Sequence, residues 1–196
     1  MKKIILTIIA LSSSSAFSDD IRLGQPAYGG NGCPNGSLSA ALSPDSKTLS
    51  VLFDSYQAEA GYTTGRNTDR KSCNIAVPVH VPQGVSISLF QLDYRGFNRI
   101  PAGGSSRLSV DYFFAGGVGP RTSRFFSGPQ SQDYLVTDQV EAGAIVWSPC
   151  GVDTNLRVNS SMVATTNSHN DQVLATVDST DIKAGLVYHV QTRACH

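Results

Sequence analysis

Long hydrophobic runs and dense charge are both scarce in this chain of 196 residues. The longest apolar run, at 4–11, is interrupted at Thr7 and is far shorter than the roughly 20 residues that a membrane-spanning helix needs. Charged residues make up 15% of the chain, and beyond the N-terminus two basic residues adjoin only at Arg70–Lys71. A nucleic-acid surface needs concentrated positive charge. We therefore expect no nucleic-acid partner and no membrane span in the mature chain.

Recognisable catalytic and metal-binding motifs are also missing. The G-x-S-x-G nucleophile elbow does not occur, and neither does the H-E-x-x-H zinc pattern or the spacing of an EF-hand calcium loop. His80, His169 and His189 could act as bases, but no serine stands out as their partner. The sequence therefore favours a protein that is not an enzyme and needs no cofactor.

The N-terminus, in contrast, has the features of an export signal. Lys2 and Lys3 precede the apolar run, and Ala16 and Ser18 place small residues at the positions that a signal peptidase inspects. We expect residues 1–18 to be removed, which leaves 19–196 as a single domain with 13 basic and 15 acidic residues. The protein is predicted to be secreted, to the periplasm or outside the cell.

Four cysteines follow the signal: Cys33, Cys73, Cys150 and Cys195. An even number in an exported chain predicts two disulfides. Structural zinc sites bring their ligands in close pairs, whereas these cysteines lie 40, 77 and 45 residues apart. Three connectivities are open. We favour Cys33–Cys73 and Cys150–Cys195, because each closes one contiguous segment, and loops of this length contribute about 4 kcal/mol each in the chain-entropy model.

The body of the chain reads as all-β. Turn-forming residues recur every 8 to 15 positions, and no window of ten residues shows a helical apolar period. We expect about nine or ten short strands in one antiparallel β-sandwich, with a jelly-roll-like or distorted-barrel arrangement as the alternative. Strands are predicted at 49–53, 75–81, 85–94, 106–114, 122–126, 134–140, 156–165, 173–177 and 186–192.

Two local features refine this picture. Pro78 cannot donate to a strand ladder, so the strand that contains it is expected at an edge or with a bulge. Residues 82–84 are expected to form a hairpin-like connection. The segment 139–144 is the one helix candidate, and it is short.

An ordered set of short strings carries a resemblance to a known family. These are GNGCPNG (30–36), LSPD (42–45), DRKSC (69–73), DYRGF (93–97), FSGP (126–129), WSPCG (147–151) and VDSTD (177–181). Together they resemble the uncharacterised secreted-protein family named domain of unknown function 4360. Members often carry a tryptophan shortly before the last cysteine, where this chain has QTRA (191–194). The resemblance implies export and a disulfide-bearing domain, and it brings no activity.

The most promising binding residues are in the string DYRGF. We expect four of its residues at the end of a strand: Asp93, Tyr94, Arg95 and Phe97. A loop tip there could bind a sugar, a peptide or a partner protein. The alternative is a buried Asp–Arg contact that closes a turn, with Gly96 supplying a positive φ. Trp147 is expected to pack on a disulfide.

Acidic residues offer weaker candidates for catalysis or metal binding. A glycosidase needs two facing carboxylates, and the available ones are Glu59, Asp93, Asp111, Asp138, Glu141, Asp178 and Asp181. Most lie beside turn signals, where Asp has a structural role. A nonstandard calcium loop at 167–171 or 178–181 is a further option.

Three functions remain after these exclusions. We expect foremost a binding protein with a protein or glycan ligand. A hydrolase of envelope or extracellular polymers is the alternative, and a structural surface or matrix component is the third option.

Overall fold

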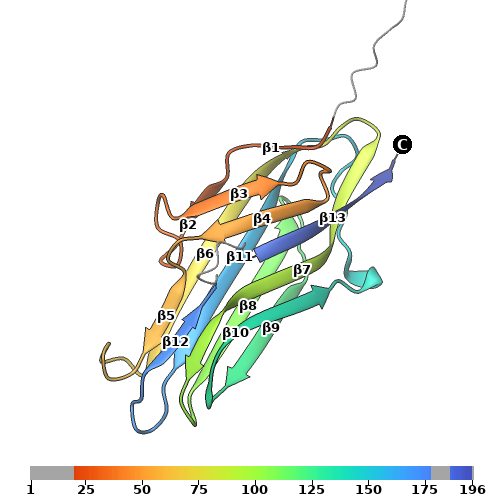
Figure 1. Ribbon diagram of the computed structural model, residues 1–196. Helices are drawn as coiled ribbons and strands as arrows, with labels where there is room; N and C mark the ends of the chain where they lie inside the picture. Colours follow the sequence, from red (N-terminus) through yellow and green to blue (C-terminus); the bar gives the residue numbers. More distant parts are fainter. Residues whose placement is uncertain (1–19, 178–185, 196) are drawn as a thin grey trace, which may run out of the picture.

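The computed structural model describes residues 20–177 and 186–195, which form an elongated body of strands (Figure 1). The elements are β1 (Arg22–Leu23), β2 (Ala27–Gly29), β3 (Leu38–Leu42), β4 (Thr48–Phe53), β5 (Gln57–Ala60), β6 (Thr68–His80), β7 (Val85–Ile100), β8 (Ser105–Phe114), β9 (Arg121–Ser127), β10 (Gln130–Gln139), a 3₁₀ turn (Ala142–Ala144), β11 (Thr154–Thr165), β12 (Val173–Thr176) and β13 (Leu186–Ala194). All nine predicted strands are present, and the expected count was too low because β1, β2, β3 and β5 were not anticipated.

The strands form two antiparallel sheets that face each other (Figure 1). The sheet built around β6 has the order β1-β6-β11-β8-β9, and β2 also pairs with β6. The sheet built around β7 has the order β3-β4-β13-β7-β12-β5, and β10 pairs with β7 as well. We call them the β6 sheet and the β7 sheet. The protein is therefore an antiparallel β-sandwich and not a barrel.

Side chains from alternate positions of the strands fill the space between the sheets. Along β4, β8 and β11, every second side chain is buried. In β6, the residues Ile75, Val77 and Val79 point inward, as their spacing predicts. Burying a branched aliphatic side chain of this kind contributes roughly 1.5–3 kcal/mol. The hydrophobic pattern therefore determines which face of each strand meets the core.

The connection at 82–84 is not a hairpin. It carries the chain from β6 in one sheet to β7 in the other. By contrast, β3 pairs with β4 and β8 pairs with β9, each within its own sheet. The sequence Pro-Gln-Gly at 82–84 predicts a tight turn, but it does not determine to which sheet the next strand belongs.

Pro78 lies at an interruption in the pairing of β6. On one side β11 pairs with β6 along its length. On the other side β1 pairs with Val79 and His80, and β2 pairs with 74–76. The carbonyl of Pro78 accepts a hydrogen bond from the N–H of Gly24, at 2.8 Å, between these two short strands. The missing N–H of Pro78 faces the same interruption, because both backbone groups of a residue point to one side.

Two disulfides close the predicted loops, Cys33–Cys73 with a Cα–Cα distance of 5.4 Å and Cys150–Cys195 with 5.9 Å. The first is fully buried and ties the loop after β2 to β6. The second joins an exposed Cys150 to a half-buried Cys195 just beyond the end of β13. Within the described residues, no helix combines the length and apolar character that crossing a membrane requires.

Candidate functional site

The string DYRGF does not form a loop tip but lies within the long strand β7. Its residues alternate, so Asp93, Arg95 and Phe97 face outward from the β7 sheet while Tyr94 and Gly96 face the core. Tyr94 is 1% exposed, and its hydroxyl lies 2.8 Å from Oγ1 of Thr122. Burial raises the pKa of Tyr94 to about 12. Three of the four predicted binding residues therefore share a surface, and Tyr94 belongs to the core.

Gly96 is needed for a close approach of neighbouring groups and not for a positive φ. Tyr134, opposite Gly96 on β10, extends across it and donates from its hydroxyl to the carbonyl of Thr176 at 2.7 Å. A Cβ at position 96 would overlap the Thr176 carbonyl oxygen and the Tyr134 phenol. Glycine in a strand interior often marks such an approach. The turn with a buried Asp–Arg contact is therefore wrong for this segment.

Asp93 is held by its neighbours on the adjacent strands. His189 Nε2 on β13 lies 2.7 Å from Asp93 Oδ2, and the Thr137 hydroxyl on β10 donates to Asp93 Oδ1 at 2.6 Å. Partial burial tends to raise the pKa of Asp93, but the hydrogen bonds from Thr137 and His189 outweigh it and hold that pKa below its ordinary value. Asp93 is therefore an ionised acceptor that aligns three strands.

Among the described residues, the Asp93–His189 pair has no nucleophile that would complete a catalytic triad. In a triad the carboxylate orients the histidine and the remaining nitrogen meets a nucleophile. The ring of His189 packs near Phe90, with 6.1 Å between the ring centroids. In the part of the chain that the structure describes, no serine, threonine or cysteine is hydrogen-bonded to the remaining nitrogen of His189.

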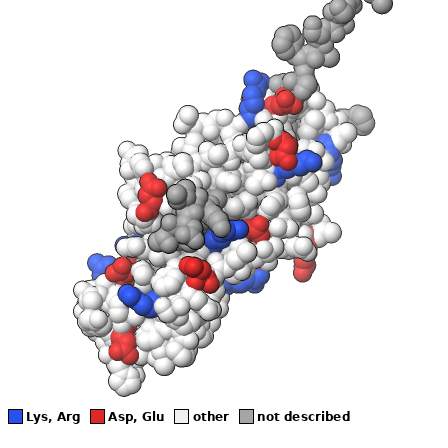
Figure 2. Space-filling model, viewed as in Figure 1, with Lys and Arg blue, Asp and Glu red and all other residues white. Residues whose placement is uncertain are grey.

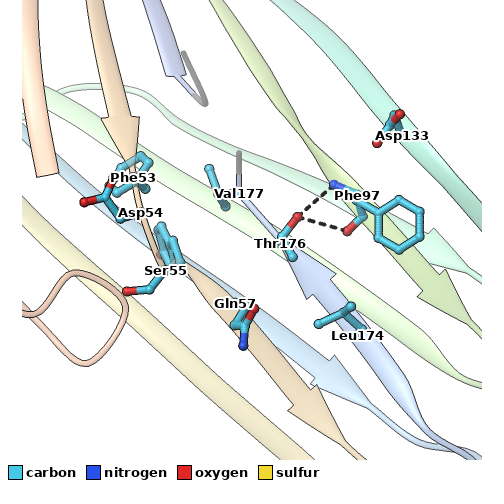
Figure 3. A pocket seen from close by; sticks show the side chains of 10 residues that line it. Phe53, Asp54, Ser55, Gln57, Phe97, Asp133, Leu174, Thr176 and Val177 are labelled. Carbon is cyan, nitrogen blue, oxygen red and sulfur yellow. Dashed lines mark hydrogen bonds between the residues drawn. The ribbon is translucent and has the colours of Figure 1, made fainter. Parts of the chain in front are cut away.

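A hollow of about 570 Å³ opens beside Phe97 on the outer face of the β7 sheet (Figure 3). β13 pairs with β7 as far as Tyr94, whereas β12 pairs with β7 at Asn98 and Arg99. Between these pairings the side chain of Thr176 forms a hydrogen bond with the backbone of β7, because the N–H of Phe97 donates to Thr176 Oγ1 at 2.9 Å. The hollow lies where one partner strand of β7 is exchanged for another.

The lining of the hollow mixes apolar and polar groups from five strands and a turn. Its residues are Phe53, Asp54, Ser55, Tyr56, Gln57, Phe97, Asp133, Leu174, Thr176 and Val177. Figure 3 shows the carboxylates of Asp54 and Asp133 on opposite sides, with Thr176 between them. An aromatic ring, aliphatic groups, hydroxyls, an amide and two carboxylates can together contact a ligand that has both C–H faces and hydroxyl groups.

Among the described residues, the remaining acidic candidates are paired with arginines or are not part of the lining of the hollow. Asp111 accepts from Arg121 at 2.7 Å, and Asp138 forms an ion pair with Arg124. Glu59 lies on β5 and Glu141 precedes the 3₁₀ turn. Asp178 and Asp181 lie outside the described residues. Acidic and basic side chains are interspersed over the face shown in Figure 2.

In the loop at 167–171, the side chain of Asn167 makes most of the polar contacts. Asn167 accepts from the backbone N–H groups of His169 and Asp171, and its own amide donates to the Asp171 carboxylate at 2.7 Å. Across residues 20–177 and 186–195, no group of three or more His, Cys, Asp or Glu side chains is arranged to hold a metal ion. The other calcium candidate, 178–181, lies outside the described residues.

Trp147 has a cationic neighbour. The Arg193 guanidinium lies 4.2 Å from the centre of the Trp147 ring. Arg193 belongs to the segment QTRA (191–194), just before Cys195. The expected packing of Trp147 on a disulfide stays a prediction.

Comparison with known proteins places these features in a family. The model of the family described as "Domain of unknown function (DUF4360)" matches residues 19–195. The chain belongs to this family. The match to DUF4360 begins at the residue predicted to start the mature chain, and the cleavage itself stays a prediction.

A relative in Arthroderma benhamiae agrees with this assignment. It is described as an "Uncharacterized secreted protein" and is 33% identical over 178 residues, which cover 90% of this chain and 73% of the relative. This DUF4360 protein is secreted. Among solved structures, TmCBM61 in complex with β-1,4-galactotriose overlaps with a TM-score of 0.27 and 10% identity, over 87% of this chain and 88% of that one. An overlap of that size carries no information about a ligand.

Proposed function

We propose that this secreted β-sandwich is a binding protein that holds a neutral, hydroxyl-rich glycan in the hollow beside Phe97. The observation that carries the proposal is the composition of that hollow. A half-buried aromatic ring and Leu174 lie next to the exposed oxygen and nitrogen atoms of Asp54, Gln57 and Asp133. Small-molecule sites commonly combine apolar walls with a few convergent polar groups.

The chemistry of a sugar ring suits this combination. Its C–H face can pack on the Phe97 ring, which supplies a large apolar area. Its hydroxyls can donate to the carboxylates of Asp54 and Asp133, and such charge-assisted hydrogen bonds are stronger than neutral ones. Phe97 and Asp133 lie on paired strands, directly opposite each other. A site built on strands loses little freedom when a ligand binds.

The hydrolase and matrix alternatives have less support. A glycosidase needs one carboxylate as an acid and a second as a base or nucleophile on the same bond. Asp54 and Asp133 are both solvent-exposed and are drawn on opposite sides of the hollow in Figure 3. A matrix component would assemble with itself, and sedimentation equilibrium that found only monomer would count against it.

The proposal is tested with two substitutions in the hollow. We expect Phe97→Ala and Asp133→Asn each to weaken binding to a neutral polysaccharide by about tenfold, which corresponds to about 1.4 kcal/mol. Binding is measured by retardation in native gels that contain soluble neutral β-glucan, galactan, xylan or chitin oligosaccharide. The matched control is Tyr62→Ala, which removes a 70% exposed aromatic side chain outside the lining of the hollow and should leave binding unchanged.

Two results would overturn the proposal. One is that none of the neutral glycans retards the wild-type protein. The other is that a neutral glycan binds the wild type, Phe97→Ala and Asp133→Asn equally, with circular dichroism showing that the variants are folded.

A further inference from the structure

The outer face of the β6 sheet carries a second polar surface, away from the hollow beside Phe97. Four strands lie side by side there in the order β6-β11-β8-β9. Their pairing register places outward-facing residues in straight rows across the sheet. Strands are about 4.8 Å apart, so a row of four spans roughly 14 Å. Such a row is long enough to contact several units of a linear polymer.

Residues of three adjacent rows line a shallow trough of about 470 Å³. Val163 and Phe125 belong to one of these rows but are not part of the lining. The middle row consists of serines, Ser72, Ser161, Ser109 and Ser123. The row on one side contains Arg70, Val163, Arg107 and Phe125. The row on the other side contains Asn74, Asn159, Asp111 and Arg121. Small hydroxyl side chains therefore form the floor, and longer side chains form the two walls.

The charges of the trough are unbalanced. Arg121 is neutralised by Asp111, since its Nη2 donates to Asp111 Oδ2 at 2.7 Å. Arg70 and Arg107 are exposed, and in residues 20–177 and 186–195 no acidic side chain forms an ion pair with either of them. A guanidinium presents a planar fork of donors that matches a carboxylate. The arginine row thus offers two guanidinium groups to an anionic ligand.

The same row also contains an aromatic platform. Phe125 lies directly opposite Arg107 in the register of β8 and β9 and is 66% exposed. Side chains in this relation have Cβ atoms about 4.5–5.5 Å apart. A ligand with a C–H face beside an anionic group could therefore contact both side chains at once. Acidic sugars have this combination, since a uronate bears its carboxylate on the ring.

We infer that the trough on the β6 sheet binds a linear polysaccharide that carries carboxylate groups, a polyuronate. Arg70 and Arg107 hold carboxylates of the polymer, and Phe125 packs on a sugar ring. Ser109 and Ser123 share a hydrogen bond at 2.9 Å and present hydroxyl groups along the floor. This site is independent of the neutral-glycan hollow, because it lies on the other sheet and uses other residues.

The test compares polygalacturonate with its fully methyl-esterified form, which has the same backbone without the charge. We expect wild-type protein to bind the acid form, less tightly as salt concentration rises, and the ester at least tenfold more weakly. Arg107→Gln and Arg70→Gln should each weaken binding of the acid form by about tenfold, as expected for the loss of a charged hydrogen bond. Arg99→Gln removes the same charge from an exposed position of the β7 sheet and should have little effect.

Several outcomes would overturn the inference. One is that polygalacturonate does not bind at low salt, and a second is that the ester binds as tightly as the acid form. A third is that Arg99→Gln weakens binding of the acid form as much as Arg107→Gln does. A fourth is that an oligothymidylate binds more tightly than polygalacturonate, which would assign the face to nucleic acid. Phe97→Ala should leave binding of the acid form unchanged. If Phe97→Ala abolishes it, polygalacturonate occupies the hollow and not the trough. Failure at the trough leaves the neutral-glycan tests of Phe97 and Asp133 unaffected.

Discussion

Two tyrosines on the core side of the β7 sheet, the partly buried Tyr134 and the fully buried Tyr188, differ in whether their hydroxyl has a hydrogen-bond partner. The hydroxyl of Tyr134 donates to the Thr176 carbonyl. Tyr188 is 0% exposed, and its hydroxyl has no hydrogen-bond partner among the residues that the structure describes. Burial raises the pKa of both phenols. The two residues are alike in sequence terms, so their difference arises entirely from the fold.

We expect the matched substitutions to have different effects. Tyr134→Phe removes a hydrogen bond and leaves the Thr176 carbonyl without it, which should lower the free energy of unfolding by about 1–2 kcal/mol. Tyr188→Phe removes a buried hydroxyl that makes no bond, so stability should be unchanged or slightly higher. Urea unfolding of the two variants and the wild type measures this. Equal destabilisation would show that Tyr188 is paired in solution.

At the scale of elements, β7 accounts for most of the difference between expectation and structure. Asp93, Gly96 and Asn98 are residues typical of turns, so the predicted strand ended at residue 94. The strand nevertheless continues to Ile100, because β10 pairs along one edge and β12 and β13 pair along the other. Pairing with distant segments overrides local preference.

Short edge strands were missed for two reasons, local preference and length. β5 has the sequence QAEA, whose residues favour helices. It is a strand because β12 pairs with it from Val173 to Thr176. β1 and β2 contain two and three residues, too few to show any periodicity.

Gly96 links three of these elements, so its substitution should disrupt all of them. Gly96→Ala would force the Thr176 carbonyl on β12 and the Tyr134 phenol on β10 to move. We expect it to lower the free energy of unfolding by more than about 2 kcal/mol, in the range of overpacked core positions. Gly143→Ala is the control, because nothing lies within 4 Å of a Cβ there. Thermal unfolding measures both, and a melting temperature for Gly96→Ala equal to that of the wild type would contradict the close approach.

At the scale of the whole molecule, the two disulfides secure different regions. Cys33–Cys73 lies in the core, with both cysteines 0% exposed. Cys150–Cys195 lies at the surface near the C-terminus. Thiol–disulfide exchange requires access to a sulfur atom, so their positions predict different reactivity in the folded protein.

We expect dithiothreitol to reduce Cys150–Cys195 first under native conditions. Cys33–Cys73 should resist until the protein unfolds, and its loss then removes about 4 kcal/mol in the chain-entropy model. Timed alkylation followed by mass mapping of the modified cysteines measures the order. Reduction of both bridges at one rate, while circular dichroism still shows folded protein, would contradict this prediction.

The order of amino acids was enough to predict secretion, the all-β class and two disulfides. It favoured one of three open connectivities, and the structure confirms that pairing. These features depend on local or compositional signals: an N-terminal apolar run, alternating hydrophobicity and widely spaced cysteines. The surfaces depend on register and sheet membership. Phe97 and Thr176 meet across the β7 sheet, and Arg70, Arg107 and Phe125 align from three strands. No local pattern brings such residues together, because long-range strand pairing sets which side chains become neighbours.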